Sequence, residues 1–290
     1  MSDHTRSDQV SGTYLRNPSE LSNSTSEFRW KDMKALNIYY KNGTVGMFGS
    51  MIDLSYNRSL LLQNVNKDFL FKVWNDDTLT KDWNNKERAL ARYISEILIK
   101  EHAEVENHEK VTDSFINFLL GILEFNEYPF ALKLKANCYF QVHDKVVTSE
   151  SDFSIWKNKL FITIDEDRHL YNINKFTWWG EYQIAGKLLA SAFVNHKEIQ
   201  EKYNTQTLFA IRVIGTRFTF YKAEIKSDYL TSLVKGFPTN NLYIYRYPEW
   251  NDQYTNHISY LDYTNLDQRR HILEIIIKIK NFIIQNKTIL

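Results

Sequence analysis

The order in which helix-like and strand-like segments follow one another is the feature that most limits how this chain can fold. Apolar residues recur every three to four positions in the helix-like segments, and strand-like segments are rich in β-branched and aromatic residues. In chain order the segments are two helices over 84–100 and 111–126, three strands over 132–147, 151–156 and 159–165, a helix over 177–200, two strands within 208–225 turned at Gly215, and a helix over 267–285. Helices and strands do not alternate one by one, so the pattern predicts an α+β protein and not a doubly wound parallel sheet.

Length and composition limit the classes of protein to which the chain can belong. Its 290 residues suffice for one large domain, and 36 Lys and Arg residues balance 35 Asp and Glu residues, so any nucleic-acid surface must be a local patch. Cys138 is the only cysteine, which excludes internal disulfides and thiolate zinc sites. The sequence contains neither a signal-peptide pattern nor an apolar stretch of membrane-spanning length. We therefore expect a soluble intracellular protein of the nucleus or cytoplasm, with no membrane partner.

The segments divide the chain into three regions. Residues 1–27 are rich in Ser, Thr, Asn and charge and are expected to be a disordered tail. Residues 28–80 are expected to form a small accessory region that contains two short strands turned at Asn42 and Gly43. Residues 81–290 are expected to form the core domain, with an edge strand over 241–247 and the long C-terminal helix packed across it.

Acidic residues gather around a tight hairpin. Asp152 lies in one strand-like segment, Asp165 ends the next, and only the turn over 157–159 separates the two segments. If these strands pair in an antiparallel hairpin, the two aspartates meet at one edge, where like charges repel unless a cation lies between them. The pattern therefore favours a divalent metal site. The alternative is a set of solvated charges where a strand leaves the core.

The order of these features resembles that of the PD-(D/E)XK nuclease superfamily. An acid on a helix comes first, an acid on each strand of a hairpin follows, and a polar-edged helix comes last. The segments that carry the resemblance are "SDFSIW", "LFITIDEDRHLYN", "GEYQIAGKLLASAFVN" and "IRVIGTRFTFYKAEI", within residues 84–225. They look most like divergent fungal members, some attached to Crinkler-type effectors. The resemblance implies a restriction-endonuclease-like core, in which helices flank a mixed β-sheet. It also implies DNA or RNA as partner and hydrolysis of phosphodiester bonds with Mg²⁺ or Mn²⁺, because hard oxygen ligands suit a hard cation.

Residue roles follow from the resemblance position by position. Asp152 matches the metal-binding acid of the first strand, Asp165 matches the acid at the end of the next strand, and Glu87 matches the helical acid. Gln183 and Lys187, one turn apart on the following helix, match positions that face the phosphate.

The chain departs from the family's E-x-K signature at the lysine. Two positions after Asp165 stands Asp167, an acid where the family has a cation. A register shifted by one residue pairs Glu166, as a metal ligand, with Arg168, which could clamp phosphate but not readily act as a base. Two further possibilities are that Lys187 reaches the site from its helix and that Asp167 serves as a third ligand for a second ion.

Plainer interpretations stand beside these roles. Asn84 followed three residues later by Glu87 is a capping-box pattern, in which the glutamate satisfies a backbone donor at the helix start. Gln183 and Lys187 could be ordinary surface residues, and Arg217 on the later hairpin could contact phosphate or be a solvated cation. The sequence thus predicts a Mg²⁺-dependent nuclease. The alternative is a catalytically inactive nuclease-fold module that binds nucleic acid or a protein partner.

Overall fold

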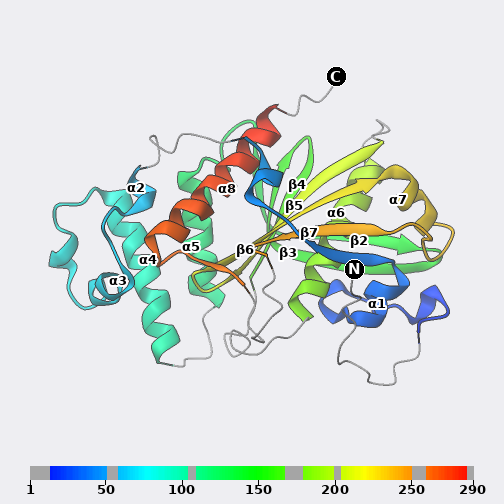
Figure 1. Ribbon diagram of the computed structural model, residues 1–290, viewed down its shortest axis with the longest axis horizontal. Coiled ribbons are helices and arrows are strands. Elements are labelled where there is room, and N and C mark those ends of the chain that lie inside the picture. Colours follow the sequence, from blue (N-terminus) through cyan, green and yellow to red (C-terminus); the bar gives the residue numbers. More distant parts are fainter. Residues whose placement is uncertain are drawn as a thin grey trace.

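The structure is a computed structural model that describes residues 14–50, 58–103, 109–166, 179–198, 204–249 and 259–285. Over these residues the chain forms an α+β protein with a mixed eight-stranded sheet, flanking helices and a long C-terminal helix (Figure 1). The strands are β1 (Ile38–Asn42), β2 (Ala131–Val142), β3 (Lys145–Lys157), β4 (Lys159–Glu166), β5 (Thr205–Ile214), β6 (Arg217–Lys226), β7 (Leu242–Tyr247) and β8 (Leu261–Asp262). The α-helices are α1 (Trp30–Ala35), α2 (Arg58–Leu61), α3 (Lys67–Val73), α4 (Asn85–His102), α5 (Glu109–Ile122), α6 (Trp179–Glu198), α7 (Ser227–Leu233) and α8 (Leu266–Gln285). The 3-10 helices are η1 (Pro18–Glu20), η2 (Thr25–Glu27), η3 (Val45–Phe48) and η5 (Asp77–Thr80).

The sheet mixes antiparallel and parallel pairs. Its strand order is β1-β7-β6-β5-β4-β3-β2, and β8 pairs with β6. The consecutive strands β2, β3 and β4 form an antiparallel meander, after which β5 joins β4 in parallel. The connection between β4 and β5 contains α6, because a parallel pair needs a crossover that returns the chain to the same end of the sheet. At the other side, β1 pairs with β7 in parallel.

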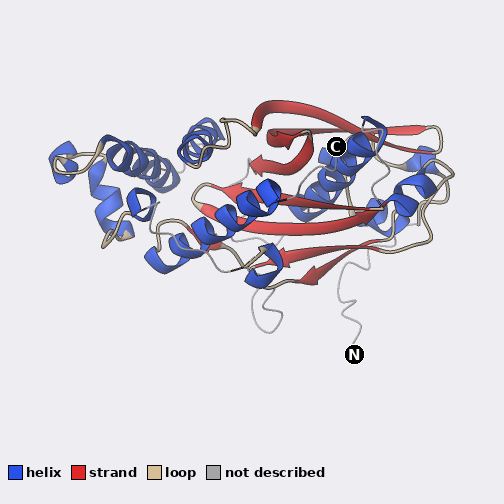
Figure 2. Ribbon diagram, turned by 90° about the horizontal axis from the view of Figure 1, so that it is seen from above, coloured by secondary structure: helices blue, strands red, loops and turns tan. Residues whose placement is uncertain are grey.

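Two hydrophobic cores lie on the two faces of the sheet. One core joins α6 and α7 to inward-facing residues of the strands, and the other joins α4, α5 and α8 to the opposite face. Helices therefore lie on both sides of the strands in Figure 2, and α2, α3 and α4 lie beyond one end of the sheet in Figure 1. The residues of α6 at helical spacing are all fully buried: Ile184, Ala185, Leu188, Leu189, Ala192 and Phe193.

The strongly periodic segments form the elements that the sequence predicts. The four predicted helices correspond to α4, α5, α6 and α8, with ends shifted by a few residues. The turn of Lys157, Asn158 and Lys159 joins β3 to β4 as predicted, and Asn158 takes the left-handed backbone conformation with φ 63°. The predicted strands over 132–147 and 151–156 have other limits, since the chain turns near His143 and runs on as one 13-residue strand, β3.

Residues 14–27 do not form the flexible tail expected for residues 1–27. Leu21 and Thr25 are buried, and the backbone N–H of Thr148 in β3 donates to the Asn23 carbonyl at 2.9 Å. A Cβ at Gly186 would lie 2.7 Å from Thr25 Cγ2, so the glycine lets η2 pack directly on α6. Apolar anchors and close backbone contact hold this polar segment in place. Residues 1–13 lie outside the described part of the chain.

The hairpin predicted at Asn42 and Gly43 does not form. Only its first half is a strand, β1, and β1 pairs in parallel with β7, which follows some 200 positions later. The second half is the 3-10 helix η3, which carries Phe48 into the core beneath α8. As a consequence β7 lies between β6 and β1 and is not the predicted edge strand. Residues 28–80 thus add a strand to the sheet and side chains to both cores.

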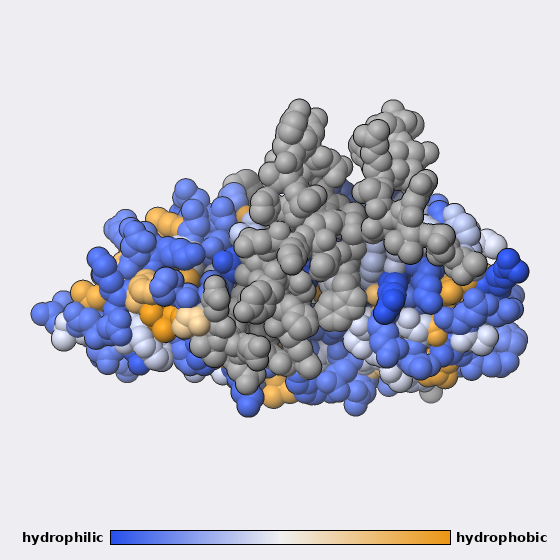
Figure 3. All heavy atoms as spheres, turned by 90° about the horizontal axis from the view of Figure 1, so that it is seen from below, coloured by the Kyte–Doolittle hydropathy of each residue, from blue (hydrophilic) through white to orange (hydrophobic). Residues whose placement is uncertain are grey.

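The described surface is mixed in character. On the face shown in Figure 3, hydrophobic side chains lie in small groups among hydrophilic ones. Among the residues that the structure describes, no helix combines the length and the apolar character needed to cross a bilayer.

Candidate active site

The two predicted aspartates meet across the β3–β4 pair. Phe153 of β3 is the register partner of Ile164 of β4, which places the preceding residue, Asp152, beside Asp165. Their carboxyl groups lie close enough for Asp152 to raise the pKa of Asp165. The hairpin therefore brings together two acids that lie 13 positions apart in the sequence, as the strand pattern predicts.

A lysine from α6 completes this group. Lys187 Nζ donates a hydrogen bond to Asp165 Oδ1, and both residues are buried, with exposed fractions of 2% and 5%. Lys135 of β2 donates in the same way to Asp152, and its side chain is 46% exposed. The group therefore runs from an enclosed pair, Asp165 with Lys187, to a more accessible pair, Asp152 with Lys135.

Burial and charge shift the acidity of the inner aspartate. Burial raises the pKa of the Asp165 carboxyl, the ammonium of Lys187 opposes the rise, and the carboxylate of Asp152 adds to it, so that the pKa is about 6. Asp165 is then mostly ionised at neutral pH, beside a second carboxylate. A divalent cation at this point would relieve the repulsion between the two.

A second ionic cluster lies next to the first. Asp165 of β4 is the register partner of Arg212 of β5, whose guanidinium lies 3.5 Å from Glu181 Oε1 of α6. The same carboxylate oxygen accepts hydrogen bonds from Tyr221 at 2.9 Å and from Arg246 at 3.2 Å. Glu181 is fully buried, so the start of α6 is fixed to three strands by one carboxylate.

Sequence reasoning missed this second cluster. The available signal was the pair Arg212 and Arg246, each inside a strongly apolar strand, since a buried arginine requires a partner. Gly180 also fits this packing: a Cβ there would lie 2.3 to 2.7 Å from the guanidinium atoms of Arg212. Because this position has no side chain, the guanidinium of Arg212 can lie directly against the start of the helix.

The other predicted site residues are not all brought to this place. Gln183 is half-buried on α6, one turn before Lys187, and lies on the same side of the helix. Arg217 forms a two-pronged ion pair with Glu101 of α4, with N···O distances of 2.9 and 3.3 Å. The side chain of Glu166 and the residues Asp167 and Arg168 lie outside the described part of the chain.

Glu87 forms the capping box that was the alternative to its role as a metal ligand. Its carboxylate accepts the backbone N–H of Asn84 at 3.1 Å, and the Asn84 side chain accepts the N–H of Glu87 at 3.0 Å. Glu101, near the other end of α4, contacts the β5–β6 turn through Arg217. At 1.5 Å per residue, Glu87 lies roughly 20 Å along the helix from that contact.

The residues present suit a hard divalent cation bound by few protein ligands. Within the described ranges, no group of three or more Asp, Glu, His or Cys side chains is placed to hold a metal. Asp152 and Asp165 are a pair of carboxylates, and Mg²⁺ is commonly bound by one or two carboxylates with water and substrate phosphate as the other ligands. The donor set thus fits Mg²⁺ or Mn²⁺ better than zinc, which prefers nitrogen and sulfur ligands.

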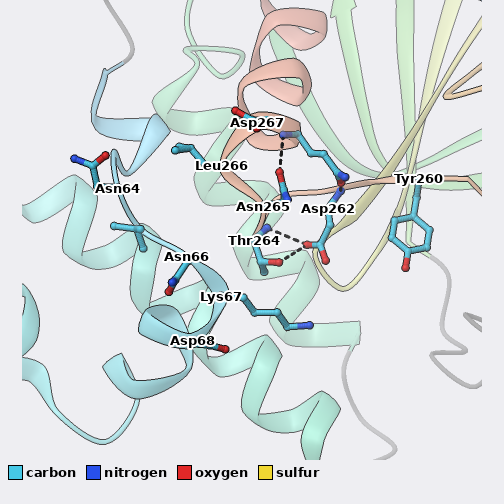
Figure 4. Close-up of a pocket in the computed structure, with 12 residues that line it drawn as sticks. Asn64, Asn66, Lys67, Asp68, Tyr260, Asp262, Thr264, Asn265, Leu266 and Asp267 are labelled. Carbon is cyan, nitrogen blue, oxygen red and sulfur yellow. Dashed lines mark hydrogen bonds between the residues drawn. The ribbon is translucent and has the colours of Figure 1, made fainter.

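A pocket of about 720 Å³ lies elsewhere, between the loop before α3 and the start of α8 (Figure 4). Several of its polar groups form hydrogen bonds: Asp262 accepts them from Thr264 and Thr216, and Asn265 caps α8 through the N–H of Gln268. None of the predicted site residues lines this pocket. We therefore place the candidate active site at Asp152, Asp165 and Lys187.

Comparison of the chain with protein-family models and with curated proteins finds no match.

Proposed function

We propose that this protein is a PD-(D/E)XK-like, Mg²⁺-dependent hydrolase of phosphodiester bonds in nucleic acid. The observation that supports the proposal is the convergence of Asp152, Asp165 and Lys187 from β3, β4 and α6. Two adjacent carboxylates with one buried ammonium are the charged groups that the resemblance requires. The restriction-endonuclease-like core is part of the same proposal.

The departure from the E-x-K signature has a physical explanation in this arrangement. The sequence continues after Asp165 with acids and not with lysine, while Lys187 reaches the same carboxylate from the neighbouring helix. The ammonium is thus supplied from α6. Its burial fixes its position, because a buried lysine is held by its charged partner.

Each residue then has a defined task. Asp152 and Asp165 would hold the cation, which when bound activates water and neutralises developing charge on the phosphate. Lys187 orients Asp165 and favours its ionised form, and Lys135 orients Asp152 through its hydrogen bond. Gln183, one turn from Lys187, offers an uncharged amide to phosphate oxygens.

Cleavage assays test the proposal directly. Purified full-length protein is incubated with plasmid DNA and with RNA in Mg²⁺, in Mn²⁺ and in EDTA. We expect metal-dependent cleavage that falls by about 100-fold or more in Asp165→Asn and Lys187→Met, since each removes a charge at the reacting centre. Asp144→Asn is the matched control, because the Asp144 side chain is 92% exposed at the β2–β3 turn, and this variant should cleave like the wild type.

A second candidate is a nuclease-fold module that binds nucleic acid without cutting it. Its support is that each aspartate already has a lysine partner and that Asp165 and Lys187 are almost fully enclosed. This candidate predicts binding that weakens steeply with salt, is indifferent to EDTA and survives Asp165→Asn. Binding without cleavage in either metal would reject hydrolysis in favour of this candidate.

A further inference from the structure

The sheet face opposite α6 is covered by helices over part of its area. Over another part it carries tyrosine and lysine side chains. The core under α6 contains Ile38, Leu242 and Ile244. Side chains alternate along a strand, so the residues next to these in the sequence point to the other face. We call these neighbours the tyrosine–lysine face: Tyr39 and Lys41 of β1, Tyr243 and Tyr245 of β7, and Lys222 of β6. Because two of its strands are β1 and β7, this face lies at the β1 edge of the sheet.

The helical cover of this sheet face stops short of the tyrosine–lysine face. Phe282 of α8 packs on Phe209 of β5, with ring centroids 5.3 Å apart. Farther toward the β1 edge, Tyr245 is 36% exposed, and Tyr39 and Tyr243 are half-buried. Figure 1 likewise shows β1 and β7 extending to the right of α8. The aromatic rings thus remain accessible from solvent.

The tyrosines and lysines of this face contact one another across the strands. Tyr39 is the register partner of Tyr243, and their ring centroids lie 6.2 Å apart. Lys41 Nζ lies 3.5 Å from the centroid of the Tyr243 ring, and Lys34 of α1 lies over the Tyr39 ring at 5.7 Å. Ammonium groups over aromatic rings are cation–π contacts. The rings of Tyr39 and Tyr243 therefore each have positive charge over one face.

The charge of this face is positive, although the chain as a whole is nearly neutral. Among the described residues, no carboxylate forms an ion pair with Lys34 or Lys41, while Lys222 pairs with Glu224 at 2.9 Å. Two lysines thus keep their charge available beside three tyrosines. A local positive patch is what a nearly neutral protein needs in order to attract phosphates.

We propose that the tyrosine–lysine face binds single-stranded nucleic acid, with bases stacked on Tyr39, Tyr243 and Tyr245 and with phosphates held by Lys34 and Lys41. Aromatic side chains beside cations are the general means of binding unpaired strands, because every base has a face that can stack. A duplex hides those faces, so single strands are favoured. The proposal does not rest on the proposed hydrolysis, since the face is turned away from α6 and Lys187.

Fluorescence anisotropy of labelled oligonucleotides tests this binding. The probes are oligo-uridine, oligo-thymidine and a duplex, each about 12 units long, mixed with the full chain in EDTA. We expect both single strands to bind more tightly than the duplex, and Tyr39→Leu with Tyr243→Leu to weaken single-strand binding by about tenfold or more. Tyr243→Phe, which keeps the ring, should bind as the wild type does.

Charge and control variants complete the experiment. Lys41→Ala should reduce by about one the slope of log affinity against log salt, because it removes one phosphate contact. Tyr128→Leu is the matched control, since Tyr128 is 99% exposed in the loop before β2 and should bind like the wild type. Tighter binding of oligo-uridine than of oligo-thymidine would identify RNA as the ligand. Equal binding of the two would show that the face recognises single strands without regard to the sugar.

The proposal is overturned if the double leucine variant, folded by its thermal transition, binds single strands as tightly as the wild type. It is equally overturned if the duplex binds best, or if Tyr128→Leu weakens binding as much as the double variant does. If the double leucine variant loses single-strand binding, the result supports the tyrosine–lysine face. It does not bear on the proposed hydrolysis at Asp165, because binding and cleavage are assayed separately.

Discussion

Asp165 and Lys187 form a buried ion pair that positions charge more than it stabilises the fold. Asp165 is 5% exposed, and its carboxylate has the ammonium of Lys187 as partner and the carboxyl of Asp152 as neighbour. Removing two charges from water costs several kcal/mol per ion, and their mutual attraction offsets this cost only with good geometry. Such a pair is a weak source of stability but a precise way to position charge. The proposed hydrolysis needs the second property.

Removing the lysine should destabilise the protein in a pH-dependent way. Lys187→Met leaves the Asp165 carboxylate buried without its ammonium, and breaking such a pair costs about 3 kcal/mol or more at pH 8. Below pH 6 the loss should shrink, because Asp165 then takes up a proton and becomes neutral. Urea denaturation at pH 5 and pH 8 measures the difference. The double variant Asp165→Asn with Lys187→Met should recover stability at pH 8, and failure to recover would show that the lysine acts by packing alone.

The acidity of Asp165 also fixes how stability varies with pH. The pKa in the folded protein, about 6, is higher than the ordinary value, so the folded state binds the proton more tightly than the unfolded state. The contribution of Asp165 to the free energy of unfolding is therefore fully present below pH 4 and declines as the pH rises to 6. Relative to Asp165→Asn, the wild type should lose up to about 3 kcal/mol over that range. Urea midpoints of the two proteins at pH 4 to 7 measure the loss, and a difference that stays constant would contradict the raised pKa.

At the scale of elements, α4 shows that a helical acid has a structural use before it has a chemical one. The carboxylate of Glu87 and the side chain of Asn84 satisfy backbone donors at the helix start. The helix packs on α3 and α5, and its other end reaches the β5–β6 turn through Glu101. A role for Glu87 in metal binding stays a prediction from the family likeness.

Two substitutions separate capping from metal binding. Asn84→Ala should cost about 1 kcal/mol in the free energy of unfolding, because it removes the acceptor for the first turn. Glu87→Gln keeps an acceptor in the capping box and should cost less, while Mn²⁺ affinity stays at the wild-type value. Chemical denaturation and calorimetric titration with Mn²⁺ give the two quantities. A large fall in Mn²⁺ affinity for Glu87→Gln would instead identify Glu87 as a ligand.

At the scale of the whole molecule, the N-terminal residues hold one core together. Phe28 is fully buried in the core under α6, edge-on to Phe140 of β2 at 6.1 Å, and Thr25 packs on Gly186. Backbone contacts tie Asn23 to β3. The segment thus joins α6 to the meander that carries Asp152.

Truncation of Phe28 tests this contribution. Phe28→Ala should lower the free energy of unfolding by about 3 to 5 kcal/mol, since it leaves a cavity between α6 and β2. Leu79→Ala, at a residue that is 37% exposed, is the matched control and should cost under about 1 kcal/mol. Thermal and urea unfolding measure both. Equal losses in the two variants would mean that residues 14–28 are not part of the core.

Much of the fold follows from local pattern, and so does the first half of the site. The periods of α4, α6 and α8 and the turn at Asn158 depend on neighbours within a few positions, which sequence reasoning can judge. Once that turn is placed, pairing of β3 with β4 makes Asp152 and Asp165 neighbours.

The remaining features depend on partners far apart in the chain. The pairing of β1 with β7, the packing of Thr25 on α6 and the bonds from Arg212 and Arg246 to Glu181 join residues separated by tens to hundreds of positions. The reach of Lys187 to Asp165 was one of several possibilities in the sequence, and only the packing of α6 on the sheet selected it. The sequence predicts the strongly periodic helices and the pairing of the hairpin acids, because neighbours within a few positions decide both. The tertiary structure decided which charges are buried together, because a buried charge requires a partner that only the folded chain can bring to it.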